Sequence, residues 1–538
     1  MIATLDHAPA ASSQNDLETR RWRVYLVAAV IVGVSLVLTA RLVELQVLES
    51  THFRAMATDE HWRQSVLPPR RGDIVDANGD PLATSVTYQS LYASTAEISD
   101  PARVASTLAP ILNVPVGLLA TQLAKKQSAP TLIQRWLPDD TANEIDRLHL
   151  AGLFLQLEPK RAYPQGNLAA QVLGVVGIDD NGLSGIELAF NGDVAGQPGE
   201  LIAERDSAGD AIALGARKYT APVDGSTLTL TIDRYVQWVA ERELRAAVDR
   251  DHASGGTVVV LDPRTGAVLA VAGLPTFQND DPDLYSPANV ALFNIPAVHQ
   301  SADPGSIFRL ISLAAALDAG AVGPETSFMN SGQLTYFGAT IHESSESPAG
   351  LETMTHAIAD SSSVGTAWAA TRVGAPRFYQ YAQAFGFGKP TAAGLPGEVA
   401  GLLRLPSDAD WLPFDLVNNS LGQGISVTPL QMAVAVAAIA NGGMLMKPYL
   451  VEKVAGQDGS RSYFPTVEGA VIRAQTATNL TRMLVATVDD RSTGEARFAR
   501  VVGYEVAGIG GIAPSDVTVG AGPSATLATF AGYAPAST

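Results

Sequence analysis

Residues 255–273 read GGTVVVLDPRTGAVLAVAG, and this stretch decides how the second half of the chain folds. Two apolar runs flank a turn that begins at Asp262 and ends at Gly266, which predicts a β-hairpin. Directly upstream, TLTLTID at 227–233 alternates like a half-buried strand and leads into a predicted helix over 236–248. The hairpin therefore opens a domain that contains a sheet.

Downstream of the hairpin the pattern is mainly helical. One helix is predicted over 304–317 with Gly320 as its stop, and a second over 428–439 is apolar on most sides and therefore buried. Strands are predicted at 503–507 and 525–533. A sheet with inserted helices is an α+β arrangement.

Composition excludes several classes of protein. The chain has 538 residues, of which 46% are hydrophobic and 17% charged, so it forms cores and holds more than one domain. A net charge of −18 disfavours binding to nucleic acid. The absence of cysteine excludes disulfides, thiol catalysis and cysteine-ligated metals.

An uncharged apolar run occupies residues 24–40, about the minimum length of roughly 17 residues that spans a bilayer. Arginines at positions 20, 21 and 23 precede it, which predicts a cytoplasmic tail over 1–23 and export of the bulk of the chain. A cleaved signal peptide would be shorter and would end in small residues, and a buried soluble helix would show a polar face. We therefore predict a retained anchor, followed by a stalk over 41–65.

The segment from 66 to 221 mixes short strands and helices. It opens with PPRRGDIVDANGDPLATS at 68–85, in which Asn78-Gly79 is a strong hairpin turn. A second tract at 161–199 is rich in glycine and turn residues, and predicts a compact irregular module packed by leucine and valine. A domain boundary is predicted at 222–225.

Several of these tracts together resemble the class B penicillin-binding proteins, and they occur in the family's order. The resemblance rests on Arg71-Gly72-Asp73-Ile74-Val75-Asp76 with Asn78-Gly79, Arg161 with Tyr163-Pro164, Gly185-Ile186-Glu187, LDPRTGAVLAVA, Pro304-Gly305-Ser306 and SLGQGISVTPLQMAVAVAAIANGG.

The resemblance implies an architecture and a role. It implies an elongated pedestal (dimerisation) domain over 66–221 and a transpeptidase domain, related to serine β-lactamases, over 222–538. Family members are single-pass proteins of the cytoplasmic membrane. They cross-link peptidoglycan stem peptides beside polytopic glycan polymerases in division or elongation complexes, without a cofactor. The family continues with another strand and a C-terminal helix where this sequence stops, which predicts a gap in the sheet.

The first catalytic motif of the family is a serine nucleophile with a lysine three residues later, one helical turn on. The matching residues are Ser306 and Arg309. Arginine stays protonated in proteins, so Arg309 can orient an anion but cannot act as the general base.

The other two motifs are altered as well. Ser361 fits the first position of the Ser-x-Asn motif, but Ser363 stands where asparagine is expected. Ile509, Gly510 and Gly511 stand where Lys-Thr-Gly should bind the carboxylate of the donor peptide. No lysine in the chain has a serine three residues before it or a Thr-Gly after it.

These departures leave three hypotheses open. We prefer a pseudoenzyme with a vestigial Ser306 that acts as a scaffold or regulator in a peptidoglycan synthesis complex. The first alternative is an active D,D-transpeptidase in which His299, His342 or His356 replaces the lysine as base. The second is a non-catalytic sensor of muropeptides or β-lactams. No histidine pair has the helical spacing of metal ligands, so no metal site is predicted.

Overall fold

The computed structural model describes residues 15–50, 62–127, 129–204, 217–279, 281–343, 349–489, 496–514 and 526–536. The chain divides into two compact units. The first consists of Met1–Leu67 and Pro198–Pro222, and the second of Pro68–Gln197 and Val223–Thr538. Residues 1–14 of the predicted cytoplasmic tail and residues 51–61 of the predicted stalk lie outside the described residues.

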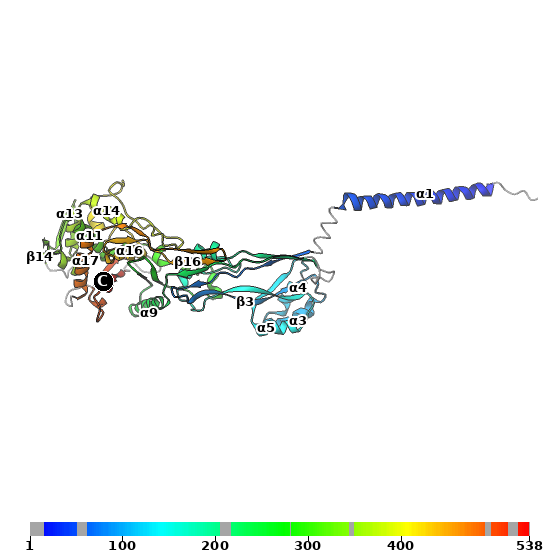
Figure 1. Cartoon of the computed structure of the whole chain (residues 1–538), viewed down its shortest axis with the longest axis horizontal. Helices are drawn as coiled ribbons and strands as arrows, with labels where there is room; N and C mark the ends of the chain where they lie inside the picture. Colours follow the sequence, from blue (N-terminus) through cyan, green and yellow to red (C-terminus); the bar gives the residue numbers. More distant parts are fainter. Residues whose placement is uncertain are drawn as a thin grey trace, which may run out of the picture. The chain divides into compact units, whose positions relative to one another are not determined.

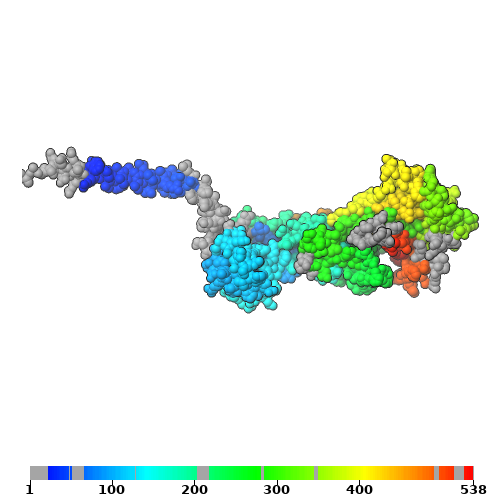
Figure 2. Space-filling view, turned by 180° about the vertical axis from the view of Figure 1, so that it is seen from behind, coloured from blue at the N-terminus to red at the C-terminus, as the bar shows by residue number. Residues whose placement is uncertain are grey.

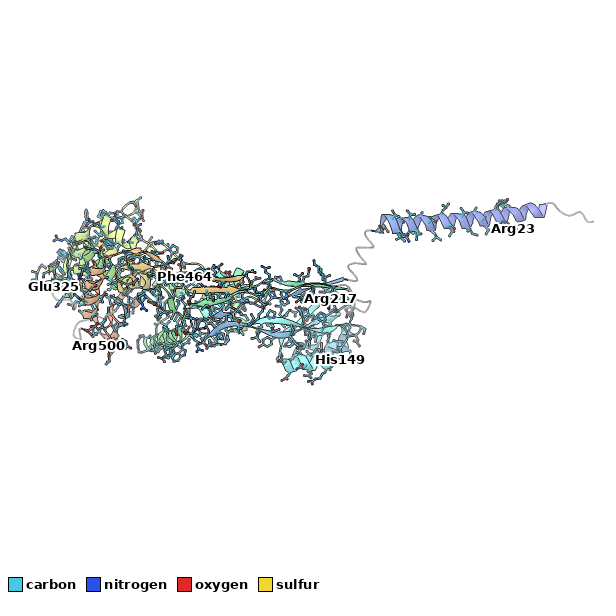
Figure 3. All side chains as sticks on the ribbon, viewed as in Figure 1. Arg23, His149, Arg217, Glu325, Phe464 and Arg500 are labelled. Carbon is cyan, nitrogen blue, oxygen red and sulfur yellow. The ribbon has the colours of Figure 1, made fainter. Side chains whose placement is uncertain are left out.

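The first unit holds the predicted anchor. Helix α1 (Asn15–Val43) is followed by the short helix η1 (Glu44–Leu48) (Figure 1), and the side chain of Arg23 projects from α1 (Figure 3). The segment Trp22–Val47 has a mean hydropathy of 2.4 and no buried part, so it is long and apolar enough to cross a membrane. Strands β1 (Trp62–Leu67), β6 (Gly199–Glu204) and β7 (Arg217–Thr220) form an antiparallel sheet in the order β1-β6-β7.

A seven-stranded sheet runs through the second unit. Its order is β17-β16-β8-β2-β3-β4, with β5 also paired to β3. It therefore joins strands of the predicted pedestal to strands of the predicted transpeptidase domain. These strands are β2 (Ile74–Val75), β3 (Pro81–Ala93), β4 (Thr131–Leu137), β5 (Leu153–Ala162), β8 (Thr227–Leu230), β16 (Val451–Gly456) and β17 (Gly459–Ser462). The hairpin predicted at Asn78-Gly79 is confirmed, since β2 and β3 pair antiparallel on either side of it.

Three helices cover one end of this sheet. They are α3 (Pro101–Leu112), α4 (Val116–Ala124) and α5 (Asp139–Arg147), which with β3, β4 and β5 enclose a separate core that includes Leu91, Leu108 and Leu137. The cyan side chains in Figure 2 show this part as a rounded lobe. The irregular module predicted at 161–199 is confirmed as three short helices, α6 (Ala170–Leu173), α7 (Gly185–Ala189) and α8 (Asn191–Val194), with buried leucines and valines between them.

The remaining elements surround the largest core of the molecule. The predicted hairpin is confirmed as β9 (Gly256–Leu261) and β10 (Val268–Leu274), and the helix before it as α9 (Arg234–Asp251). The predicted buried helix is α16 (Pro429–Ala440), which contacts both β9 and β20 (Thr526–Tyr533). The other elements are η2 (Pro282–Tyr285), η3 (Val290–Phe293), α10 (Pro296–His299), β11 (Ser327–Asn330), β12 (Gln333–Tyr336), β13 (Ala339–His342), β14 (Gly350–Thr353), α12 (Met354–Ala359), α13 (Ser363–Val373), α14 (Ala375–Ala384), α15 (Asp415–Ser420), β15 (Met444–Met446), β18 (Val467–Ala470), α17 (Ala474–Asp489) and η5 (Arg497–Ala499).

Two predictions of element boundaries need correction. The helix predicted over 304–317 begins as the 3₁₀ turn η4 (Gly305–Phe308) and becomes α-helical only in α11 (Arg309–Asp318), because Gly305 has a φ of +60°. The strand predicted at 503–507 is wrong. Strand β19 runs over Ala507–Pro514 and pairs antiparallel with β20. The preceding residues form a turn with Val502 89% exposed, and pairing starts where Ala507 becomes buried.

The β9–β10 and β19–β20 pairs are separate two-stranded sheets among the described residues. Both lie on α16, yet β9 and β20 are not hydrogen-bonded to each other in the part of the chain that is described.

Candidate active site

Ser306 lies in the turn η4, which packs directly against strand β19. The N–H of Gly305 donates to the carbonyl of Gly422 over 3.0 Å, and a Cβ at Gly305 would lie 2.7 Å from the Cβ of Ala513. Ser306 itself is partly exposed, and its Oγ makes no hydrogen bond to the residues that the structure describes. Glycine at 305 thus allows the close approach that brings the serine beside β19.

Arg309 bridges the first and second motifs. Its Nη1 donates to Ser361 Oγ over 2.6 Å, and its Nη2 donates to Ser363 Oγ over 3.1 Å. The structure therefore brings together three residues that the sequence placed in one site. The guanidinium occupies both serine oxygens as acceptors, which is a positioning role that fits its planar fork of donors.

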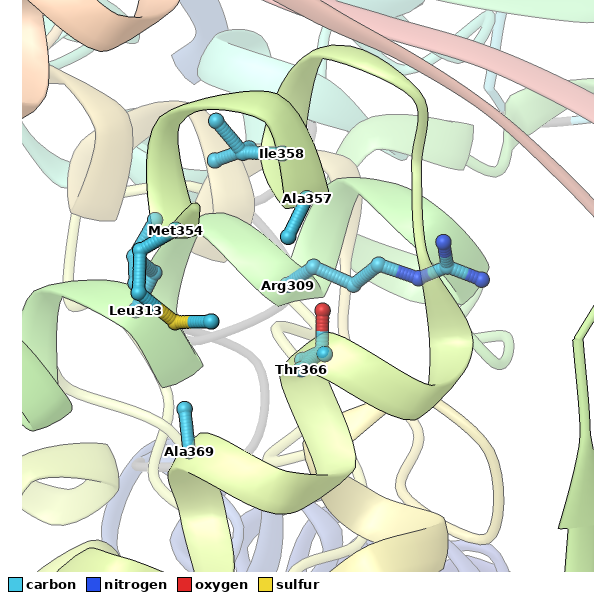
Figure 4. Close-up of a pocket in the computed structure, with 8 residues that line it drawn as sticks. Arg309, Leu313, Met354, Ala357, Ile358, Thr366 and Ala369 are labelled. Carbon is cyan, nitrogen blue, oxygen red and sulfur yellow. The ribbon is translucent and has the colours of Figure 1, made fainter. Parts of the chain in front are cut away.

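The aliphatic part of Arg309 lines a small cavity. Figure 4 shows the side chain running between Ala357 and Thr366, with Leu313 and Met354 away from the guanidinium. The cavity is about 10 Å³, the size that admits about one water molecule. The stem is thus packed among apolar side chains, while the charged end faces the serines.

Ser361 is held in an unusual backbone conformation between α12 and α13. Its φ is +53°, in the left-handed region that residues with a Cβ rarely adopt. The next residue, Ser362, caps α13 by accepting a hydrogen bond from the N–H of Gly365 over 2.9 Å. The carboxylate of Glu343 also lies at this helix start.

The third motif forms part of β19. Ile509 is 2% exposed and packs in the main core, opposite Ala531 in the register. Gly510 pairs with Phe530, and a Cβ at Gly511 would lie 3.0 Å from the backbone nitrogen of Ile307. An apolar side chain buried in the core therefore stands where the family resemblance expects a cation.

Comparisons with known proteins identify the family. The penicillin-binding protein transpeptidase domain matches residues 256–538, and the penicillin-binding protein dimerisation domain matches residues 66–230. The chain is 30% identical over 529 residues to stage V sporulation protein D of Bacillus subtilis, covering 96% of this chain and 80% of that one. The chain belongs to the class B penicillin-binding proteins.

Further relatives support the same family assignment. Penicillin-binding protein PbpB of Mycobacterium tuberculosis is 32% identical over 534 residues, covering 94% of this chain and 78% of that protein. Among solved structures, penicillin-binding protein 3 from Mycobacterium tuberculosis has a TM-score of 0.65 at 28% identity, with 88% of each chain covered. A peptidoglycan synthetase from Bifidobacterium adolescentis has a TM-score of 0.70 at 25% identity, covering 88% of this chain and 90% of that one.

The family membership fixes the coarse role of this class B penicillin-binding protein. It is a single-pass membrane protein of the peptidoglycan D,D-transpeptidase family, with a dimerisation domain and a transpeptidase domain. Within the described residues, no group of three or more His, Asp or Glu side chains is arranged to hold a metal ion.

The three histidines that could replace the lysine lie in different surroundings. In His299, Nδ1 accepts from the N–H of Ile295 over 2.7 Å, and Nε2 lies 2.7 Å from the carbonyl of Pro396, to which it must donate. Both ring nitrogens are thus engaged in the neutral form. His342 and His356 are exposed on β13 and α12, and no hydrogen bond joins either to Ser306 within the described residues.

Asn330 and Glu352 are two buried polar residues near α13 that the sequence analysis did not predict as part of the site. Asn330 donates from Nδ2 to Glu343 Oε2 over 3.1 Å and to Glu352 Oε2 over 3.0 Å. Burial raises the pKa of Glu352, and the nearby carboxylates of Glu343 and Asp360 raise it further. No motif spacing marks these residues, because they come together only when β11, β13 and β14 fold against α13.

Proposed function

We propose that this protein is a catalytically impaired class B penicillin-binding protein that acts as a scaffold or regulator of peptidoglycan synthesis. The observation that carries the proposal is the position of Arg309, whose guanidinium bonds Ser361 and Ser363 where the family places its catalytic lysine. Within the described chain no hydrogen bond joins Ser306 Oγ to a lysine, arginine or histidine side chain, which supports a serine without a positioned base.

Arginine at position 309 and isoleucine at position 509 would each slow acyl transfer. A guanidinium has a pKa above about 12 and cannot serve as a base at neutral pH. Removing one member of a catalytic unit costs on the order of 10⁴ to 10⁶ in rate. The burial of Ile509 also leaves the carboxylate of a donor peptide without its designated cation.

The anchor and the pedestal would carry the remaining function. Three arginines precede the segment Trp22–Val47, which supports a cytoplasmic N-terminus in the inner membrane, with the bulk of the chain outside. The anchor would pack against a polytopic glycan polymerase of a division or elongation complex, with peptidoglycan beside the exported part. Co-purification with such a polymerase should survive Ser306→Ala and fail when residues 1–48 are deleted.

Fluorescent penicillin tests the proposal directly. The full chain in detergent should show no covalent label above the Ser306→Ala background. Penicillin-binding protein 3 from Mycobacterium tuberculosis, which has been solved in complex with ampicillin, is the positive control. Labelling that disappears in Ser306→Ala would overturn the proposal and support an active transpeptidase with a substitute base.

A second candidate function is non-covalent sensing of muropeptides or β-lactams. One observation favours it: Ser361 and Ser363 accept hydrogen bonds from Arg309, so their own O–H groups can donate to an anionic ligand. A soluble muropeptide should then bind saturably, and Arg309→Met should weaken the binding while Ser306→Ala should not. A flat titration would remove this candidate.

A further inference from the structure

Glu343 accepts hydrogen bonds from four donors at the start of α13. Its Oε2 accepts from Ser362 Oγ over 2.7 Å, from Asn330 Nδ2 over 3.1 Å and from the N–H of Val364 over 3.2 Å. Its Oε1 accepts from the N–H of Ser363 over 2.8 Å. The carboxylate and the cap by Ser362 together satisfy the first three N–H groups of the helix, which otherwise have no partner within it.

This helix start carries the two serines that hold Arg309. Ser363 is the first residue of α13, and its backbone N–H binds Glu343 while its Oγ accepts from Arg309. Ser361 precedes the cap residue in a left-handed conformation with a φ of +53°, which persists only when the surrounding structure enforces it. A bonded chain therefore runs from the carboxylate through the helix start and the serines to the guanidinium.

We propose that Glu343 is a positioning residue that fixes Ser361 and Ser363, and through them the guanidinium of Arg309. It lies on the segment after β13, outside the three family motifs, and contacts none of Ser306, Ile509 or Gly511 by a hydrogen bond in the described chain. The role does not depend on whether the domain acylates, because it concerns the geometry of the site alone. Four donors converging on one carboxylate supply the restraint.

The matched control is Glu398, a carboxylate of the same unit with a similar set of bonds. It accepts from Thr391 Oγ1 over 2.6 Å and from the N–H groups of Ala392 and Ala393 over 2.8 Å each. Among the described residues, no hydrogen bond joins Glu398 to Ser361, Ser363 or Arg309. Glu398→Gln therefore removes comparable hydrogen bonds without touching the proposed chain of contacts.

The test measures the reactivity of Arg309 toward phenylglyoxal, a reagent that modifies guanidinium groups, by mass spectrometry of the peptide that contains it. In the full chain in detergent, Glu343→Gln should raise the modification rate of Arg309 by about tenfold, which corresponds to about 1.4 kcal/mol of lost restraint. Glu398→Gln should leave the rate unchanged. In a Ser361→Ala/Ser363→Ala background the rate is already high, and adding Glu343→Gln should change it by less than about twofold.

The background experiment separates positioning from general loosening of the domain. If Glu343→Gln raises the rate equally with and without the two serines, or if Glu398→Gln raises it as much, the proposal is wrong. An unchanged rate in Glu343→Gln would also overturn it. Where Glu343→Gln does not fold, Glu343→Asp keeps the charge on a shorter side chain and should give a smaller rise of the same sign; no rise in that variant overturns the proposal.

Discussion

Glu187 is the acid at the centre of a buried ion network in the pedestal, and its replacement by glutamine should be among the most damaging single changes in the protein. Its Oε2 lies 2.7 Å from Arg71 Nε, and its Oε1 lies 2.6 Å from Arg161 Nε. The side chains of Arg71 and Glu187 are 0% exposed and that of Arg161 is 5% exposed. Two guanidinium groups therefore share one carboxylate out of contact with water.

The expected loss in the free energy of unfolding depends on which partners the two arginines keep after Glu187→Gln. Arg71 also donates to the carbonyl of Asp180, to Asn191 Oδ1 and to the carbonyl of residue 187, so its donors keep neutral partners. The charge itself loses its counter-ion, and removing one partner of a buried pair typically costs about 3–5 kcal/mol. Two pairs share the acid, so their losses do not simply add. We expect the free energy of unfolding to fall by about 3–5 kcal/mol.

Urea denaturation of the full chain in detergent, followed by tryptophan fluorescence, measures this loss. With a slope of roughly 3 kcal/mol per M, the midpoint should fall by about 1–2 M urea. The control is Glu243→Gln in the pair with Arg242, whose side chains are 62% and 53% exposed; exposed pairs contribute about 0.2–1 kcal/mol. A loss of less than about 1 kcal/mol in Glu187→Gln would refute the reasoning, because it would mean that the network is not desolvated.

Three further predictions concern the transpeptidase domain. Burial raises the pKa of Asp318, but hydrogen bonds from Arg473 and its neighbours outweigh this and lower the pKa below its usual value. Asp318→Asn should therefore lower the melting temperature most at pH 7, and the difference should shrink as the pH falls through the lowered pKa. Burial raises the pKa of Glu352, so its ionisation opposes folding at neutral pH; Glu352→Gln should raise the melting temperature at pH 7, and this gain should vanish near pH 4. Gly305→Ala should destabilise the domain by about 1–3 kcal/mol in urea denaturation, because its φ is +60° and its Cβ would meet that of Ala513; an unchanged midpoint would contradict the geometry.

Local sequence chemistry was enough to predict much of the fold. The hairpin of β9 and β10 follows from two apolar runs around the turn at Asp262, and α16 follows from the apolar composition of residues 428–439. Strand β19 could not be found this way. Its sequence Ala-Gly-Ile-Gly-Gly-Ile-Ala-Pro has five small residues, three glycines and two alanines, and few residues that favour strands, so its extended form depends on pairing with β20.

The residues of the candidate site also differ in whether the sequence could predict them. Arg309, Ser361 and Ser363 could be placed in one site because the family order of motifs relates segments far apart in the chain. Glu343 could not, because its four donors come from residue 330 and residues 362–364, which meet only through the folding of β11, β13 and α13. A carboxylate that caps a helix from another segment has no local sequence signature, since only the three-dimensional fold supplies its partners.

Arg309 stands where the family resemblance leads us to expect a lysine, and the two side chains differ in their chemistry. A lysine ammonium offers three donors at one point and can lose a proton, whereas a guanidinium offers donors along a rigid plane and stays charged. One of the two serine oxygens that receive Nη1 and Nη2 belongs to the α12–α13 junction and the other to the first residue of α13, so the planar group links these two positions. The side chain of Ile509 is packed in the main core and is 2% exposed. Arg309 and Ile509 therefore each contribute hydrogen bonds or packing of their own, which helps to keep this part of the domain compact.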